Sequence, residues 1–366
     1  MFASLSTACC MFTDKYYPDR IAAESLDNYL EKGWYRMGQS IFTTHFLSFN
    51  RRFYSAIWIR LALKDYAFGK RARKLRRRNE RSLRYEFGTM RIDAEKELLY
   101  QEYRADFSGT ISQSLKEAML DGEEGNVYNT WEVRVYEGDE LVAFSFFDVG
   151  QEGVASILGV YSSHYKQYSL GFYTMLLEIE WCMEQEMLYY YPGYVVPGYE
   201  RFEYKKRIGE VEYYDLHADD WLPWDQLEAS GIPLDNMQNK LAELEAVLLQ
   251  RDVPCRFLHY PFFEANLFSF FSAPYLDYPV LLWCYPQEGT KTFFLAVFNV
   301  REDAWQLLKC GVYEDMFLSM NASYAASFNK EHYFLELALV DGVLFTSKDP
   351  FEMAEAIRDC AQTAPN

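Results

Sequence analysis

The segment from residue 131 to residue 215 constrains the fold more than any other part of this 366-residue chain. Residues 131–136 and 141–148 are rich in aromatic and β-branched side chains, and they flank a turn at Glu137-Gly138-Asp139. Two such runs around a short polar turn predict a β-hairpin. Residues 155–161 predict a third strand of the same kind.

The same segment continues with a helix and further strands. Ser169 is placed to cap a helix that runs to about Gln185. Residues 188–191 and 210–214 then predict later strands. A meander of strands that enters a helix through a small-residue turn and ends in an aromatic strand is typical of proteins that transfer an acyl group to an amine.

Composition limits the class of protein. Half of the residues are hydrophobic and 18% are aromatic, enough for one large domain or two ordinary ones with real cores. No apolar run approaches the roughly 20 residues of a membrane span, and residues 1–20 lack the features of a signal peptide. We therefore expect a cytoplasmic protein. The seven cysteines are mostly isolated in apolar segments, which favours reduced core thiols over disulfides.

The charge is unevenly distributed. A net charge of −18 counts against nucleic-acid binding by the whole surface. Residues 64–84 are nevertheless strongly basic and predict a helix, or the loop that enters one. A local contact with phosphates and a solvated helix face both fit this pattern. The almost contiguous cations are Lys70, Arg71, Arg73, Lys74, Arg76, Arg77 and Arg78.

Outside the central segment, hydrophobic spacing predicts the remaining elements. Helices are expected at residues 21–32, ending at Gly33, and at 95–104, 112–120, 234–248 and 351–361. Residues 42–53 are expected to be extended or looped, and strands are expected at 278–285, 292–300, 333–339 and 343–346. The predicted domains are an N-terminal subdomain at 1–90, a core at 91–229 and a C-terminal α+β domain at 230–366.

Six short motifs carry a resemblance to a known family. They are Tyr17-Pro18-Asp19-Arg20, the run from Leu30 to Gly38, Arg60 followed by Arg76-Arg77-Arg78-Asn79, Tyr168-Ser169-Leu170-Gly171, the run from Tyr189 to Tyr194, and Arg201-Phe202-Glu203-Tyr204-Lys205. In this order and spacing, residues 14–215 resemble the arginyl/leucyl-tRNA–protein transferases. The resemblance implies an α+β fold with a GNAT-like acyltransferase core, a small N-terminal subdomain and an additional C-terminal domain.

The resemblance also implies a reaction and its partners. Charged tRNA would donate Arg or Leu to the N-terminal α-amine of an acceptor protein, and neither a membrane nor DNA would be a partner. Because the ester is already activated, the protein has to position two substrates, remove a proton from an amine and stabilise an oxyanion. No Ser-His-Asp arrangement is expected for this chemistry.

Site residues follow from the same motifs. Asp148 is the candidate proton acceptor, or else a turn cap, and Tyr194 is the candidate donor to the oxyanion beside a strand break at Pro192-Gly193. Tyr190 and Tyr191 are candidates to stack on the terminal adenine, or else belong to an aromatic strand. The other substrate-binding candidates are Arg36, Tyr161, Ser169, Gly171, Arg201, Tyr204 and Lys205, and the tRNA-binding candidates are Arg60 and the seven cations of residues 70–78.

The chain departs from the family at its cysteines. In the family, cysteines associated with a metal or iron–sulfur cluster stand in the N-terminal element and before the arginine of the basic element. The corresponding positions here hold Asp14, Phe53 and Ala56. We therefore predict no metal and no cofactor.

Two alternatives remain open. One is a non-catalytic relative that binds a protein N-terminus or a partner, and a pocket filled by Tyr or Phe rings would favour it. The other is a GNAT-type N-acyltransferase with a different donor, which a phosphate cradle at residues 169–172 would favour. A basic groove beside the pocket would favour the tRNA-dependent transferase.

Overall fold

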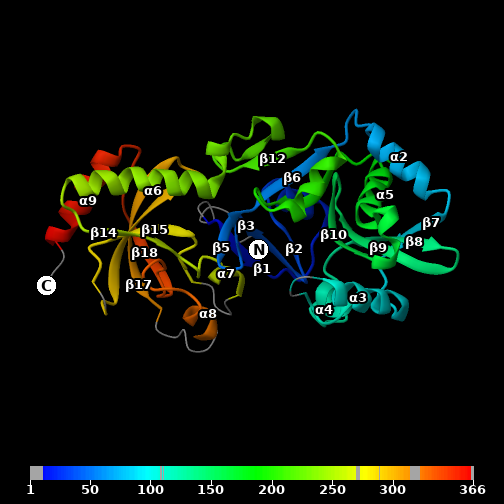
Figure 1. Ribbon diagram of the computed structural model, residues 1–366, viewed down its shortest axis with the longest axis horizontal. Helices are drawn as coiled ribbons and strands as arrows, with labels where there is room; N and C mark the ends of the chain where they lie inside the picture. The colour runs from blue at the N-terminus through cyan, green and yellow to red at the C-terminus, as the bar shows by residue number, and fades with distance from the viewer. Residues whose placement is uncertain are drawn as a thin grey trace.

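The computed structural model describes residues 11–363 except 108, 110, 269–272, 288 and 314–321. It is an α+β structure, as predicted, with an eight-stranded sheet at one end and a five-stranded sheet at the other (Figure 1). Within the described ranges, no helix has the length and apolar character needed to cross a membrane.

The eight-stranded sheet contains the predicted hairpin and third strand. Its strands in order are β13 (Asp220–Pro223), β12 (Glu212–Asp215), β6 (Ile57–Ala62), β11 (Tyr189–Val195), β10 (Gly153–Tyr161), β9 (Glu140–Val149), β8 (Thr130–Glu137) and β7 (Leu83–Thr89). All neighbours are antiparallel except β10 and β11, which are parallel. A parallel pair needs a crossover, and α5 (Leu170–Glu184) supplies it.

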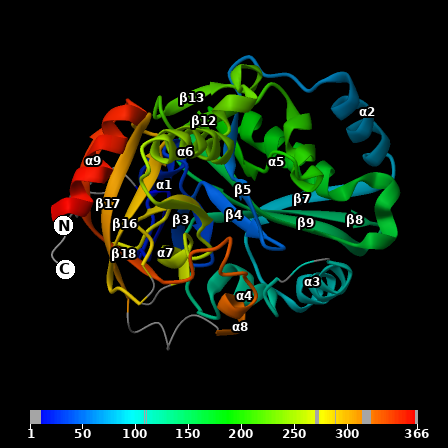
Figure 2. The ribbon, with the colours of Figure 1, turned by 60° about the vertical axis from the view of Figure 1, so that its left-hand side comes forward.

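Helices cover both faces of this sheet. Alternate residues of a strand point to opposite faces, and in β9 the side chain of Ala143 packs with Leu170 and Tyr173 of α5. Phe144 and Phe146 pack instead with Leu99 of α3 (Ala94–Asp106) and its neighbour α4 (Leu115–Leu120). The basic helix α2 (Lys70–Asn79) lies against α5 (Figures 1 and 2).

The N-terminal residues form small sheets beside the large one. Strands β1 (Thr13–Tyr16), β2 (Tyr35–Met37) and β3 (Ser40–Thr44) make one, and β4 (Phe46–Phe49) with β5 (Arg52–Ser55) makes another. Helix α1 (Ala23–Glu31) ends before Gly33, whose φ of +71° is the left-handed conformation expected after a helix. Strand β6 lies inside the large sheet, and the predicted domain boundaries stay predictions.

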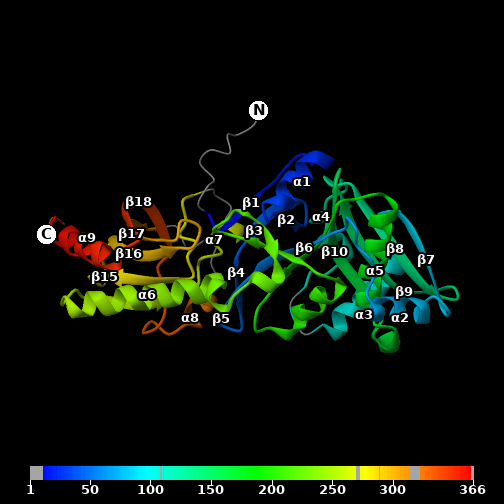
Figure 3. The ribbon, with the colours of Figure 1, turned by 90° about the horizontal axis from the view of Figure 1, so that it is seen from above.

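The C-terminal part is a five-stranded antiparallel sheet, β14 (Cys255–His259), β15 (Val280–Cys284), β16 (Thr292–Asn299), β17 (Ala304–Val312) and β18 (Ala338–Ser347). Helices α6 (Pro233–Gln250) and α9 (Pro350–Thr363) pack on it and on each other (Figures 1 and 3). The short helices α7 (Ala265–Phe268) and α8 (Ala322–Ala326) lie between its strands in the chain.

Two sequence-based assignments in this part need correction. The predicted strand at 333–339 is wrong, because Tyr333 makes only an isolated bridge with His259 and the strand begins at Ala338. Strands β14 and β17 were not predicted. The helix at 234–248 is confirmed, and Leu234, Met237, Leu241, Leu244 and Leu248 form its buried face.

One hydrophobic cluster joins the N-terminal sheets to the C-terminal part. Phe12 and Phe46 belong to the same buried cluster as Met237, Phe263 and Leu295. The edges of Phe12 and Phe46 meet at a centroid distance of 5.3 Å, and Phe46 meets Phe263 at 6.4 Å. The core therefore continues across the predicted boundary near residue 230.

Candidate active site

The parallel strands β10 and β11 separate after a short paired stretch. Only residues 153–155 of β10 pair with residues 189–191 of β11, although β10 continues to Tyr161 and β11 to Val195. Pro192 has no N–H to donate, and Gly193 has a φ of +91°. Strand β11 continues through Pro192-Gly193, but its register against β6 shifts there and its pairing with β10 ends at Tyr191.

Tyr35 fills the inner end of this opening. Its hydroxyl lies 2.5 Å from the carbonyl oxygen of Ser156 and 2.7 Å from that of Tyr191, so it bridges the two separating strands. Burial raises the pKa of Tyr35 well above its usual value, and the hydroxyl keeps its proton. Sequence reasoning missed Tyr35, although it stands beside Arg36 in one of the family motifs.

Lys205 lies beside the opening. It belongs to the 3₁₀ segment η2 (Glu200–Ile208), and its ammonium donates a hydrogen bond to the carbonyl oxygen of Tyr194 at 3.1 Å. A Cβ atom on Gly193 would lie 3.1 Å from Nζ, so the glycine leaves room for the ammonium. The side chain is half-buried, and burial lowers the pKa of Lys205 to about 8.

A cavity of about 470 Å³ lies at the end of β10. Two of its lining residues, Tyr161 and Arg201, are among the predicted substrate-binding residues. The guanidinium of Arg201 stacks 4.0 Å from the ring of Phe107. The lining residues are Tyr103, Asp106, Phe107, Tyr161, Ser163, Lys166 and Arg201. Three of the seven carry a charge, and two of these charges are positive.

Tyr204 lies next to this cavity. Burial raises the pKa of Tyr204, and the neighbouring Tyr161 raises it further. The phenol of Tyr103 is close to both Tyr161 and Tyr204. The rings of Tyr103 and Tyr161 meet edge to face at 5.3 Å. The structure therefore brings together four of the predicted residues, Tyr161, Arg201, Tyr204 and Lys205, on β10 and η2.

The start of α5 differs from the prediction. Ser169 has a left-handed backbone with φ of 51°, and its side chain makes no capping hydrogen bond. This conformation arises because Ser169 also ends the preceding 3₁₀ segment η1 (Ser163–Tyr168), where its N–H bonds to the carbonyl of Lys166. The ring of Tyr161 lies against Gly171, where an added Cβ would come within 2.8 Å.

A buried carboxylate lies under the separating strands. Glu178 of α5 is fully buried, and its Oε2 accepts a 2.7 Å hydrogen bond from the hydroxyl of Tyr190. Its Oε1 has no hydrogen-bond partner in the described part of the chain. Burial raises the pKa of Glu178 to about 7, and the hydrogen bond from Tyr190 opposes that shift. Sequence reasoning missed Glu178, whose signal is an acidic residue inside an apolar helix.

The aromatic rings of β11 do not line the 470 Å³ cavity. Tyr190 is fully buried on Glu178, and the ring of Tyr191 packs at 5.6 Å on Trp221. The ring of Tyr194 meets Trp58 at 5.2 Å. Among the described residues, none of these three rings lines the 470 Å³ cavity. Their predicted roles toward adenine and the oxyanion stay predictions.

Arg36 and Asp148 form a buried ion pair on the α4 side of the sheet. Arg36 Nη1 lies 2.9 Å from Asp148 Oδ1, with both side chains at most 1% exposed. Thr130 also donates to Asp148 Oδ1 at 2.5 Å, and the Arg36 guanidinium stacks 4.4 Å from the ring of Tyr128. Neither residue lines either described cavity. The predicted catalytic role of Asp148 stays a prediction, and the geometry is that of a structural ion pair.

The predicted tRNA-binding residues divide into two groups. Arg60 is buried, with Nε 2.6 Å from Glu212 Oε2, and Arg76 pairs with Glu180 of α5. The remaining six cations of α2 are exposed. Arg78 and Asn79 hydrogen-bond to carbonyl oxygens of η1, which attaches the end of this basic helix to the segment that holds Lys166.

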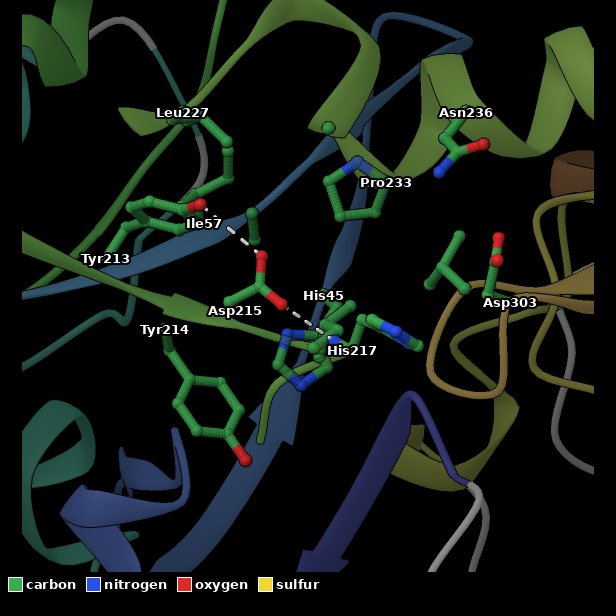
Figure 4. A pocket seen from close by; sticks show the side chains of 14 residues that line it. His45, Ile57, Tyr213, Tyr214, Asp215, His217, Leu227, Pro233, Asn236 and Asp303 are labelled. Carbon is green, nitrogen blue, oxygen red and sulfur yellow. Dashed lines mark hydrogen bonds between the residues drawn. The ribbon is translucent and has the colours of Figure 1, made fainter. Parts of the chain in front are cut away.

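A second cavity, of about 300 Å³, lies between the large sheet and the C-terminal part. Figure 4 shows Asp215 and His217 across the space from Asn236 and Asp303. Burial, helped by Arg301, lowers the pKa of His45 in its wall well below the usual value, so this imidazole is neutral.

The positions of the family's cysteines do not fit a cluster. Asp14 lies on β1, the ring of Phe53 packs on Phe263 at 5.2 Å, and Ala56 is buried. No group of three or more His, Cys, Asp or Glu side chains suited to a metal occurs in the described ranges. Cys9 and Cys10 lie outside the described residues.

Comparison with known proteins adds to this geometry. Residues 95–215 match the family described as "Arginine-tRNA-protein transferase, C terminus". An aspartate/glutamate leucyltransferase of Leptospira interrogans is 24% identical over 195 residues, 52% of this chain and 74% of the relative. One of Brucella suis is 35% identical over 78 residues, 21% of this chain and 31% of the relative.

Solved structures give weaker likenesses. FemX has a TM-score of 0.37 at 11% identity, covering 55% of this chain and 69% of that one. The C-terminal domain of a putative lysylphosphatidylglycerol synthetase from Agrobacterium fabrum has a TM-score of 0.34 at 13% identity, covering 53% and 65%.

The separated strands and the crossover helix define an acyltransferase-like core. The sequence matches point the same way: residues 95–215 are similar to the aminoacyl-tRNA–protein transferases, the family that the motifs indicated.

Proposed function

We propose that this protein transfers an amino acid from charged tRNA to the N-terminal α-amine of an acceptor protein. The observation that carries the proposal is the separation of β10 and β11 beside a cavity with two cationic side chains. Unpaired strand backbone offers hydrogen-bonding groups to an extended donor. The cavity at the same end of β10 gives the second substrate a place beside it.

Arg201 and Lys166 suit an acidic acceptor. Both line the cavity, and an arginine guanidinium binds a carboxylate through two parallel hydrogen bonds. The relatives are named aspartate/glutamate leucyltransferases, which supports the same acceptor chemistry and leucine as the donor. We therefore propose acceptors that begin with Asp or Glu.

A GNAT-type transferase with a pyrophosphate-containing donor is less well supported. Such a donor needs open backbone N–H groups at the start of α5. The ring of Tyr161 lies against Gly171 in the first turn of that helix, next to the place where such a donor would bind.

The test is transfer of radiolabelled Leu or Arg from charged tRNA to peptides that begin with Asp, Glu, Arg or Lys. We expect transfer to the acidic peptides. Arg201→Gln should raise the KM for an acidic peptide about 10- to 100-fold, as expected for the loss of a charged hydrogen bond. Arg207→Gln, in the same segment but outside the cavity lining, is the matched control.

Absence of transfer from either charged tRNA to any peptide would refute the proposed function. Equal KM values for Arg201→Gln and the wild-type protein would leave the proposed function standing but would show that the acceptor does not bind in this cavity.

A further inference from the structure

Lys205 is a half-buried cation without a carboxylate partner. Arg36 has Asp148 at 2.9 Å, and the buried Lys96 has Glu132 at 3.3 Å. In the described part of the chain, no carboxylate lies within 4 Å of Lys205 Nζ. The ammonium contacts the Tyr194 carbonyl and lies 5.4 Å from the ring of Tyr194 and 5.6 Å from that of Phe202.

A partly buried ammonium without a carboxylate partner is unfavourable for folding. Burial removes its hydration, and one carbonyl with two ring faces replaces only part of that interaction. An apolar side chain at position 205 would avoid the loss. A cation at such a position is therefore a candidate for a functional group.

The ammonium lies where the two strands separate. The point where a Gly193 Cβ would stand is 3.1 Å from Lys205 Nζ and 3.9 Å from the Tyr35 ring carbon that carries the hydroxyl. That hydroxyl bridges the carbonyls of Ser156 and Tyr191. An ammonium has three N–H donors, and among the described residues Lys205 uses one of them, on Tyr194. Two donors remain for a ligand at this point.

On the basis of the proposed function, we propose that the Lys205 ammonium binds the carbonyl oxygen of the donor ester and stabilises the oxyanion formed during transfer. This role differs from binding an acidic acceptor, for which Arg201 and Lys166 are available in the adjacent cavity.

The transfer reaction leaves Lys205 chemically unchanged. The acceptor α-ammonium first loses one proton to solvent water, and its nitrogen then bonds to the ester carbon while the carbonyl electron pair moves to oxygen. When the intermediate collapses, the bond to the ribose oxygen breaks, and that oxygen takes the second proton from the nitrogen. Lys205 donates a hydrogen bond throughout and keeps its own proton.

The titratable groups around Lys205 are phenols and carboxyls. Burial raises the pKa of Tyr194 to about 12, and those of Tyr35 and Tyr204 are also raised, so these phenols stay neutral. Two buried carboxyls act on these phenols, Glu178 on Tyr35 and Tyr204 and Glu264 on Tyr194, and burial raises the pKa of each carboxyl to about 7. On η2 the other charged groups are Glu200, Arg201, Arg207 and the Glu203–Lys206 pair at 2.5 Å.

The variant test separates turnover from binding. Lys205→Met should lower kcat about 10²- to 10³-fold, the usual effect of removing one oxyanion donor. The KM for charged tRNA should change little, because the interaction forms only in the transition state. Lys206→Met removes a neighbouring ammonium that pairs with Glu203 and should behave as the wild-type protein.

The dependence of the transfer rate on pH distinguishes this role from a structural one, because a purely structural lysine would not change the shape of the profile. The wild-type rate should rise as the acceptor amine, with a pKa of about 8, loses its proton. It should fall at higher pH as Lys205 becomes neutral. Lys205→Arg keeps its charge at all these pH values, so its lower rate should rise to a plateau without the falling limb.

Three results would overturn the inference: a wild-type kcat in Lys205→Met, a falling limb retained in Lys205→Arg, or no falling limb in the wild-type protein. If circular dichroism shows that Lys205→Met is unfolded, the pH–rate profiles of Lys205→Arg and of the wild-type protein test the inference instead. An inactive wild-type protein would refute the proposed function itself. An active wild-type protein with active Lys205→Met would refute only the role of Lys205.

Discussion

At the residue scale, Asp148 has two possible roles, and its surroundings distinguish them. A proton acceptor has to reach the amine, whereas Asp148 is fully buried beneath the sheet and bonded to Arg36 and Thr130. Burial raises the pKa of Asp148, and Arg36 opposes that shift. The ion pair ties β2 to β9, which are more than 100 residues apart in the chain.

Asp148→Asn is therefore expected to reduce stability. Removing one partner of a buried ion pair leaves the other charge uncompensated and costs about 3–5 kcal/mol. Urea unfolding should show this loss, whereas Asp139→Asn, in the exposed turn of the same hairpin, should change the unfolding free energy by less than about 0.5 kcal/mol. If Asp148→Asn has wild-type stability but transfers about 10²–10⁴ times more slowly, Asp148 is the proton acceptor.

Sequence motifs could locate residues but could not pair them. Arg36 and Asp148 were both selected, yet their pairing depends on how β2 crosses the large sheet. Glu178 and Tyr35 were missed because their importance comes from burial and from the carbonyls around them. Lys205 was selected as a candidate to bind substrate, and only the structure shows that it is half-buried with its ammonium on the Tyr194 carbonyl.

At the element scale, periodic patterns gave reliable predictions where one face of the element is buried. Helix α6 has such a pattern. Strand β9 and helix α5 are buried on more than one face, and they were predicted from their apolar composition and flanking turns, with small errors at their ends. The segment 333–339 failed because Phe334 is buried by packing its ring on Trp283 and Phe293, at 5.4 and 5.0 Å, and not by strand pairing. Apolar residues buried in this way imitate the pattern of a strand.

Helix α2 carries the prediction about tRNA. Lys70, Arg71, Arg73, Lys74 and Arg77 are exposed and have no acidic partner within 4 Å in the described ranges. Replacing Arg71, Arg73 and Arg77 by Ala should weaken tRNA binding and reduce its salt dependence by about one slope unit per lost phosphate contact. Filter binding at several salt concentrations measures both quantities.

The control for this experiment matches its change in charge. Lys309, Lys348 and Arg358 are exposed in the C-terminal part, and their triple Ala variant also removes three positive charges. Its binding should stay close to that of the wild-type protein. If the two triple variants lose equal affinity, the effect comes from net charge, and α2 is only a solvated helix face.

At the scale of the whole molecule, the C-terminal part is attached through the core and not through a surface contact. Met237 on α6 and Phe263 belong to the cluster that also contains Phe12 and Phe46. The carboxylate of Asp277 accepts hydrogen bonds from the backbone N–H groups of Phe12 and Thr13, at 2.5 and 3.2 Å. No sequence motif marks this junction, because the residues that form it are about 200 to 265 positions apart.

A shared core predicts that the two ends of the molecule unfold together. Met237 is fully buried, and Met237→Ala should cost about 2–5 kcal/mol through the cavity that it leaves. If the core is one cooperative unit, hydrogen exchange should accelerate to a similar extent in α9 and in the distant α5, and calorimetry should show one transition at a lower temperature. Val343→Ala, at an exposed position on β18, should change neither measurement. Faster exchange confined to residues 230–363, or a second transition, would mean that the C-terminal part folds as an independent domain and that the buried contacts between the parts contribute little to the stability of the large sheet.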